Sequence, residues 1–137
     1  MSLFKVLDIS GTGMHAQTVR LNTVASNMAN VDSVSSNDQD TYRSKQPVFQ
    51  TIMDDMTNEP AGGVRIKEIV ESQEPLKMEY NPNHPMANEE GYIYRPNVNV
   101  VEEMANMMSA SRSYETNIEV MNTSKQLLIR TIQLGKG

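Results

Sequence analysis

The sequence predicts a mainly α-helical chain in which long N- and C-terminal helices pair as a coiled-coil-like bundle around a small β-rich insertion. Both ends carry apolar residues at helical spacing, whereas residues 32–98 do not. The C-terminal pattern, Val100–Leu134, would form a helix about 50 Å long. A compact domain of 137 residues is only about 40 Å across. The helices must therefore extend past their own domain and pack against other chains, as in an assembly subunit.

We expect three parts, of which the first and last form the assembly core. They are an N-terminal helix in residues 1–31, a loop and β-rich middle in residues 32–98, and a C-terminal helix in residues 99–137.

The N-terminal helix is predicted by an apolar 3-4 spacing that fits a narrow coiled-coil seam better than a broad core face. Gly11 and Gly13 weaken its first turns, each by about 1 kcal/mol relative to Ala, so the isolated segment should fray. Ser10 and Gln17 are polar interruptions of the kind that fixes register at some loss of stability. The predicted seam runs through Leu7, Ser10, Met14, Gln17, Leu21, Val24, Met28 and Val31.

Three asparagines lie close together on the other face of this helix, although Asn is a mediocre helix former. We expect the amides of Asn22 and Asn27 to hydrogen-bond neighbouring helices in a crowded bundle. Asn30 precedes a polar stretch and is expected to mark the end of the helix. His15, on the polar side, is interpreted as an ordinary surface residue.

The middle of the chain lacks helical periodicity. Residues 32–41 form a polar linker, and short β-like runs follow, separated by Gly and Pro. These runs are Tyr42–Ile52, Val64–Val70, Leu76–Tyr80 and Gly91–Tyr94. The insertion is too short to hold an active-site cleft of its own.

Side chains suited to catalysis are few. The absence of cysteine excludes disulfides, thiolate metal sites and thiol nucleophiles. His84 lies in Asn-Pro-Asn-His-Pro and is interpreted as a turn residue, although an acid–base enzyme using His84 with Glu89 or Glu90 is an alternative. Asp38 and Asp40 lack the Gly and the downstream Glu of a calcium loop. We therefore predict no enzyme, no metal site and no cofactor.

The C-terminal helix has clear signals at both ends. Asn99 is a predicted N-cap with Glu102 three residues later, as in a capping box. Glu102 and Glu103, together a helix start, complement the positive end of the helix dipole, and Gly135 is the predicted stop. Its stripe runs through Val101, Met104, Met108, Ser111, Tyr114, Ile118, Met121, Lys125, Leu128 and Ile132.

The net charge and the hydropathy of the chain exclude some classes of binding partner. A net charge of −5 without basic clusters argues against general nucleic-acid binding. No apolar run approaches the roughly 18 residues of a membrane span, and the N-terminus does not resemble a Sec signal peptide. Eleven methionines suit irregular seams between helices.

Three segments resemble one protein family. Ile9–Asn30 (ISGTGMHAQTVRLNTVASNMAN) resembles the N-terminal signature of bacterial flagellar rod and hook proteins. Tyr114–Ile132 (YETNIEVMNTSKQLLIRTI) resembles their paired C-terminal helix. Tyr80–Met104 (YNPNHPMANEEGYIYRPNVNVVEEM) resembles the proximal-rod members of that family, so that the resemblance covers nearly the whole chain.

The resemblance implies a structural subunit of the proximal rod of the flagellar basal body. Such a subunit stacks helically, in the periplasm, with other rod proteins and copies of itself into a tubular drive shaft and export channel for motility. It leaves the cytoplasm unfolded through the flagellar type III export apparatus, without a cleaved signal peptide. We expect neither a nucleic-acid partner nor direct membrane insertion. A cytoplasmic coiled-coil adaptor or export chaperone, which would share the helical stripes, is the alternative.

Both helices are marginal alone, because ordering costs about 1–2 kcal/mol per residue before any packing. We therefore expect residues 1–35 and 100–137 to be partly disordered in the monomer and to order on incorporation. The predicted assembly interface comprises Leu7, Met14, Gln17, Leu21, Asn22, Val24, Asn27, Met28, Val101, Met104, Met108, Tyr114, Ile118, Met121, Leu128 and Ile132.

Overall fold

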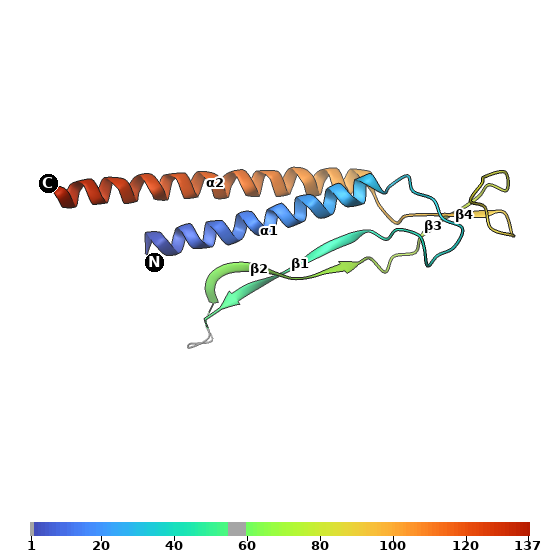
Figure 1. Cartoon of the computed structure of the whole chain (residues 1–137), viewed down its shortest axis with the longest axis horizontal. Coiled ribbons are helices and arrows are strands. Elements are labelled where there is room, and N and C mark those ends of the chain that lie inside the picture. Colours follow the sequence, from blue (N-terminus) through green and yellow to red (C-terminus); the bar gives the residue numbers. More distant parts are fainter. Residues whose placement is uncertain (1, 55–59) are drawn as a thin grey trace.

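A computed structural model, which describes residues 2–54 and 60–137, has two long helices and four short strands. The elements are α1 (Leu3–Ala29), β1 (Lys45–Met53), β2 (Pro60–Glu71), β3 (Lys77–Tyr80), β4 (Tyr92–Arg95) and α2 (Val100–Lys136). Helix α1 lies between α2 and the β1–β2 hairpin, and β3 and β4 lie beyond the far end of α1 (Figure 1). The long terminal helices and the small antiparallel insertion are confirmed.

Helix α1 has polar caps at both ends. The Ser2 hydroxyl accepts a hydrogen bond from the Lys5 N–H at 3.2 Å. At the other end Asn30 is the C-cap, as predicted, and its Nδ2 donates to the Ser26 carbonyl at 2.8 Å. Gly13 lies where the helices approach closely, because a Cβ atom there would come within 3.0 Å of the Asn117 Oδ1 atom. This glycine therefore weakens α1 locally but permits its packing on α2.

Helix α2 begins as predicted but ends later. The Asn99 Oδ1 atom accepts hydrogen bonds from the Val101 and Glu102 N–H groups at 3.1 and 3.5 Å. The prediction that Gly135 stops the helix is wrong, since α2 extends to Lys136 with Gly137 as its C-cap. A helical glycine costs only about 1 kcal/mol relative to Ala, which is too little to end a helix on its own.

The strands form two separate antiparallel pairs near the predicted positions. β1 pairs with β2, with register irregularities between Val48 and Phe49 and between Thr51 and Met53. β1 begins three residues later than predicted, at Lys45, and the hydroxyl of Tyr42 before it donates to the Asn27 Oδ1 of α1. β3 pairs with β4, and the backbone of Ser35 in the polar linker pairs with Tyr94.

The apolar core is small. Ile93, Pro96 and Val98 are fully buried beside the start of α2, and Ala16, Val24 and Ala110 are buried on the helices. Most large apolar side chains of α2 are exposed. The chain therefore covers only part of the apolar surface that its two helices present.

His84 is a turn residue, as predicted. Its N–H donates to the Asn81 carbonyl at 3.1 Å, and its Nδ1 accepts from the Met86 N–H at 3.1 Å. His15 is exposed on α1, also as predicted.

Candidate assembly surface

The predicted apolar stripe of α2 is largely uncovered by the rest of the chain. Val101 is 76% exposed and Met108 is 61% exposed. Tyr114, Met121 and Leu128 are half-buried. The exposed apolar members of the stripe are Val101, Met104, Met108, Ile118 and Ile132. Five of the eight predicted interface residues of α2 are thus left uncovered by the rest of the described chain.

The buried side of α2 is made of small and polar residues instead. Glu103, Ala110 and Ser124 are buried, and Asn117, in the same heptad series, contacts α1 at Gly13. Hydrophobic periodicity missed this face, because none of these residues except Ala110 is apolar. Their spacing of seven residues was the one signal that could have revealed it.

Polar contacts set the register between the helices. Arg20 Nη2 donates to Asn106 Oδ1 at 2.9 Å, and Asn27 hydrogen-bonds Glu103. With the Gly13–Asn117 contact, these pairs show that α1 and α2 run antiparallel. The Oε1 atom of Gln17 is buried and has no hydrogen-bond partner among the described residues.

The predicted α1 interface residues are divided between the inside and the surface of the chain. Val24 and Asn27 are buried within it, and Asn22 is exposed. Leu7, Met14, Gln17, Leu21 and Met28 are half-buried and keep some surface for a neighbour.

Asn27 joins the end of α1 to the start of β1. It is 0% exposed, and its Nδ2 donates to the Lys45 carbonyl at 2.8 Å. Its Oδ1 accepts from the Lys45 N–H at 2.9 Å and from the Tyr42 hydroxyl at 2.8 Å. One side-chain amide thus satisfies both backbone groups of Lys45, as a neighbouring strand would. Asn supplies both a donor and an acceptor, which a carboxylate cannot do.

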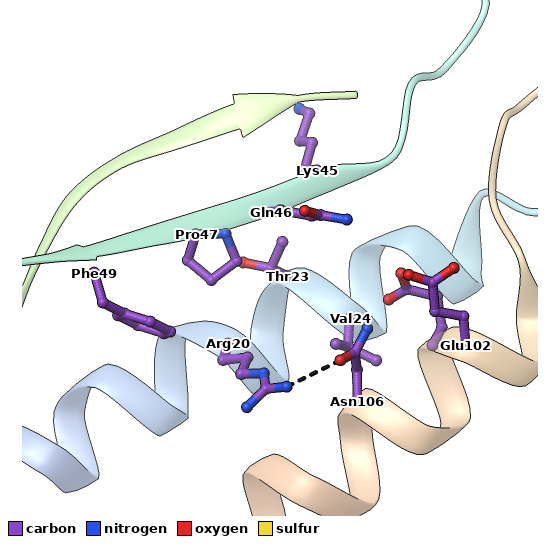
Figure 2. Close-up of a pocket in the computed structure, with 10 residues that line it drawn as sticks. Arg20, Thr23, Val24, Lys45, Gln46, Pro47, Phe49, Glu102 and Asn106 are labelled. Carbon is purple, nitrogen blue, oxygen red and sulfur yellow. Dashed lines mark hydrogen bonds between the residues drawn. The ribbon is translucent and has the colours of Figure 1, made fainter. Parts of the chain in front are cut away.

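A cleft of about 400 Å³ opens between α1, β1 and the start of α2. Figure 2 shows Arg20 reaching from α1 to Asn106 of α2 below Pro47 and Phe49 of β1. Glu103 also lines this cleft.

Glu103 is a buried acid, which the interpretation of Glu102 and Glu103 as a simple helix start missed. It is 3% exposed, and its Oε2 has no hydrogen-bond partner among the described residues. Burial raises the pKa of the Glu103 carboxyl, and the charge of Glu102 adds to this rise. The hydrogen bond to Asn27 and the charge of Arg20 act in the opposite direction. The ionised carboxylate therefore destabilises the helix junction in this chain.

Two classes of site are missing from the described residues. Their His, Asp and Glu side chains form no group of three or more that could hold a metal ion. None of the described helices has both the length and the hydropathy to cross a membrane.

Comparison with known proteins places both helices in flagellar rod families. The family described as "Flagella basal body rod protein" matches residues 7–35, and "Flagellar basal body rod FlgEFG protein C-terminal" matches residues 89–134. The flagellar basal-body rod protein FlgC of Salmonella typhimurium strain LT2 is 48% identical over 136 residues, which cover 99% of this chain and 100% of that protein. The chain belongs to the FlgC family of flagellar basal-body rod proteins.

More distant FlgC relatives extend over the same length. FlgC of Escherichia coli O157:H7 is 47% identical over 136 residues, covering 99% of this chain and 100% of that protein. FlgC of Aquifex aeolicus strain VF5 is 39% identical, covering 99% of each chain. The predicted resemblance is confirmed, and this chain is a structural protein of the flagellar rod.

Proposed function

We propose that this chain builds the proximal rod by helical assembly with homologous rod subunits and with further copies of itself. The resulting tube would cross the periplasm and serve as drive shaft and export channel. The observation that carries the proposal is the exposed apolar stripe of α2, from Val101 to Ile132. Several large apolar side chains exposed along one helix are typical of an interaction site.

Within this proposal the helices and the middle have different tasks. Residues 1–31 and 99–137 form the assembly core, and residues 32–98 form a smaller domain beside it. The interface combines the α2 stripe with the half-buried residues of α1 and with the exposed amide of Asn22. Support comes from α1, where Met14, Leu21 and Met28 retain accessible surface although α1 already contacts α2 and the hairpin.

Assembly is proposed to be coupled to folding. In the dilute monomer residues 1–35 and 100–137 would be partly disordered, with the remaining order concentrated around the buried Asn27 contacts. The thin core supports this view, because few apolar contacts are available to offset the entropy of ordering two long helices.

Amide hydrogen exchange of the dilute monomer tests this coupling. We expect fast exchange in the last turns of α2, intermediate exchange around Asn27, and protection throughout both helices only in assembled rods. Slow exchange along both helices of the monomer would contradict the proposal. Together with a stable small oligomer, it would favour the adaptor or chaperone hypothesis.

Export through the flagellar type III apparatus is proposed as the route to the rod. The direct test is the intact mass of the chain recovered from purified basal bodies. A mass that retains the N-terminal residues of α1 is expected, whereas loss of a leader segment would contradict export without cleavage. Absence of the chain from the basal bodies would contradict the proposed function itself.

A further inference from the structure

A small polar cavity lies between the base of the β1–β2 hairpin, the segment that follows β4 and the first turns of α2. Its volume is about 40 Å³, which is enough for a group of the size of a water molecule but not for a large side chain. Serines, side-chain amides and three glutamates line it, and no Lys, Arg or His is among these described residues. The glutamates are Glu74, Glu102 and Glu103. The cavity therefore combines a polar wall with negative charge.

The amide groups of the cavity wall already have partners within the chain. Asn97 Nδ2 donates to the carbonyls of Ser72 and Glu74 at 3.4 and 2.9 Å. Its Oδ1 accepts from the Ser44 N–H at 2.8 Å, and the Asn99 Oδ1 is the N-cap acceptor of α2. The groups that remain are chiefly carboxylate oxygens, which can only accept hydrogen bonds. A ligand that suits this wall is a hydrogen-bond donor with a positive charge.

Glu103 lacks such a partner in the single chain. Its side chain is 3% exposed, and its Oε2 has no hydrogen-bond partner among the described residues. Arg20 is the base whose charge acts on this carboxyl, but its Nη2 donates to the Asn106 Oδ1 at 2.9 Å. A buried carboxylate is unfavourable unless a cation pairs with it. Glu103 is therefore an acid whose counter-charge is incomplete within its own chain.

The other bases near the cavity are engaged elsewhere. Each contacts an oxygen outside the cavity wall: Arg43 lies 2.7 Å from Asp38, Lys45 lies 4.0 Å from Glu71, and Lys77 donates to the Val98 carbonyl at 3.4 Å. The three glutamates do not converge on one point as metal ligands would, since no group of three acids or histidines among the described residues could hold a metal ion. The missing cation must therefore come from outside the chain and must need fewer than three carboxylates.

Exposed apolar side chains flank the cavity. Val70 is exposed and pairs across the hairpin with Gln46, which lines the cavity. Val100 and Val101 are exposed directly before Glu102. A partner that covered these valines would exclude water from the cavity and so strengthen an ion pair inside it. Val101 also belongs to the α2 stripe, so the cavity adjoins the proposed assembly interface.

We propose that this cavity receives the ammonium group of a lysine from a neighbouring rod subunit. The inference rests on the proposed rod function. An ammonium carries three donors and no acceptor, which matches the wall, and its compact head fits the volume better than the planar guanidinium of arginine. The lysine pairs with Glu103, and Val70, Val100 and Val101 cover its stem. Glu103 thus lowers the stability of the free subunit but stabilises the assembled one.

A competition between two chains tests the role of Glu103. The wild type and Glu103→Gln would be expressed together in a flagellated bacterium that lacks its own copy, and mass spectrometry would give their ratio in whole cells and in isolated basal bodies. We expect Glu103→Gln to be depleted by about tenfold or more in basal bodies, because the lysine would lose its charge partner. Glu115→Gln, which removes an exposed acid of the same helix, should enter the rod as the wild type does.

The direction of the effect separates docking from a purely structural role. Glutamine keeps the shape of the side chain and removes the buried charge, so it should stabilise the free subunit. If Glu103 acted only within its own chain, Glu103→Gln would enter basal bodies as well as the wild type or better. Depletion of this variant is expected only where a partner uses the charge.

A second measurement identifies the cation in the unmodified chain. Carbodiimide coupling of basal bodies should join Glu103, or the exposed Glu102 beside it, to a lysine of another subunit. Products with Lys45 or Lys77 do not count, because these lysines lie near the cavity in the same chain. The Lys45–Glu71 product shows that the reagent has reacted.

The possible failures can be told apart. Equal or preferred incorporation of Glu103→Gln would show that the cavity holds water or nothing and would overturn the inference. Depletion without a product at Glu102 or Glu103, in samples that contain the Lys45–Glu71 product, would show a free cation in place of a lysine and would also overturn it. Both results leave the rod function intact. If the wild-type chain is absent from basal bodies, the rod function itself fails, and this inference fails with it.

Discussion

Helices α1 and α2 are both long and amphipathic, but only α1 is covered on two sides by its own chain (Figure 1). The shorter helix, α1, with 27 residues, buries Ser10, Ala16, Thr23, Val24 and Asn27. The longer helix, α2, with 37 residues, buries Glu103, Ala110 and Ser124. The difference shows that α1 organises the subunit, whereas most of the large apolar side chains of α2 remain exposed.

The largest effect is expected when a charged residue is placed on each helix in turn, because this tests whether the exposed face of α2 and the packed face of α1 are both needed for assembly. Ile118→Asp lies on the exposed stripe of α2 and should abolish rod assembly and swimming, because a carboxylate cannot be buried between helices without a partner. Leu21→Asp should also abolish assembly, with some added disturbance of α1, since Leu21 is half-buried. Swimming in soft agar and the rod content of basal-body preparations measure the outcome.

Thr116→Asp is the matched control, because Thr116 is exposed and polar and lies outside the predicted stripe. It should swim like the wild type. Normal motility of Ile118→Asp would show that the exposed stripe is not an assembly surface. A β-rich middle that keeps its dispersed NMR signals in both Asp variants would confirm that the defect lies in assembly.

The next largest effect is expected at the junction of α1 with β1. Asn27→Ala leaves both backbone groups of Lys45 without their side-chain partners and should destabilise the chain by about 2–4 kcal/mol. Asn27→Asp should be no milder, because it buries a charge and loses the donor. Urea unfolding followed by circular dichroism gives the change. The exposed Asn22→Ala should stay within about 0.5 kcal/mol of the wild type, and equal effects at the two sites would contradict the assigned role of Asn27.

A smaller difference in stability is expected between alanine substitutions at the two glycines of α1. Gly11→Ala should stabilise the helix by about 1 kcal/mol, because a Cβ atom there meets nothing within 4 Å. Gly13→Ala should lose most of this gain, since its Cβ would press on the Asn117 side chain at 3.0 Å. Thermal dissociation of assembled rods that carry either variant compares them directly, because both helices are packed in the rod. Equal stabilisation would show that α2 does not approach α1 closely at Gly13.

The smallest expected effect is the pH dependence caused by Glu103. Its raised pKa means that the folded chain binds the proton more tightly than the unfolded chain does. This contribution to stability is therefore complete below the ordinary carboxyl pKa of 4.5 and is lost as the pH rises through the raised value. Glu103→Gln should melt at a slightly higher temperature at neutral pH and show a flatter pH profile. Glu102→Gln should flatten the profile less than Glu103→Gln does, because it removes only the charge that adds to the rise of the Glu103 pKa.

Patterns within single elements predicted much of this fold. The apolar spacing of Val101, Met104 and Met108 indicated a helix, and Asn99 marked its start. That these side chains are exposed agrees with the predicted assembly surface, which stays a prediction. The position of Gly135 was misjudged because the effect of one glycine on a helix end is small compared with the accumulated helical preference before it.

The contacts between elements could not be predicted in the same way. Asn27 was expected to be packed, but its main partner, Lys45, lies 18 residues away in a strand. The inner face of α2 was missed because Glu103, Asn117 and Ser124 carry no apolar signal. Asn117 packs against α1 because Gly13 is small, and Glu103 has the Asn27 amide and the Arg20 guanidinium as partners across the seam. These contacts appear only when α1 and α2 are placed together.

The polar seam between α1 and α2 has a mechanical consequence. An apolar seam can slide by a turn and find similar contacts, but the Gly13–Asn117, Arg20–Asn106 and Asn27–Glu103 contacts each need one particular partner. Sliding one helix along the other would break all three together and bring mismatched side chains into contact. A subunit under torsional load would therefore resist shear as a single stiff element, although it contains no covalent cross-link.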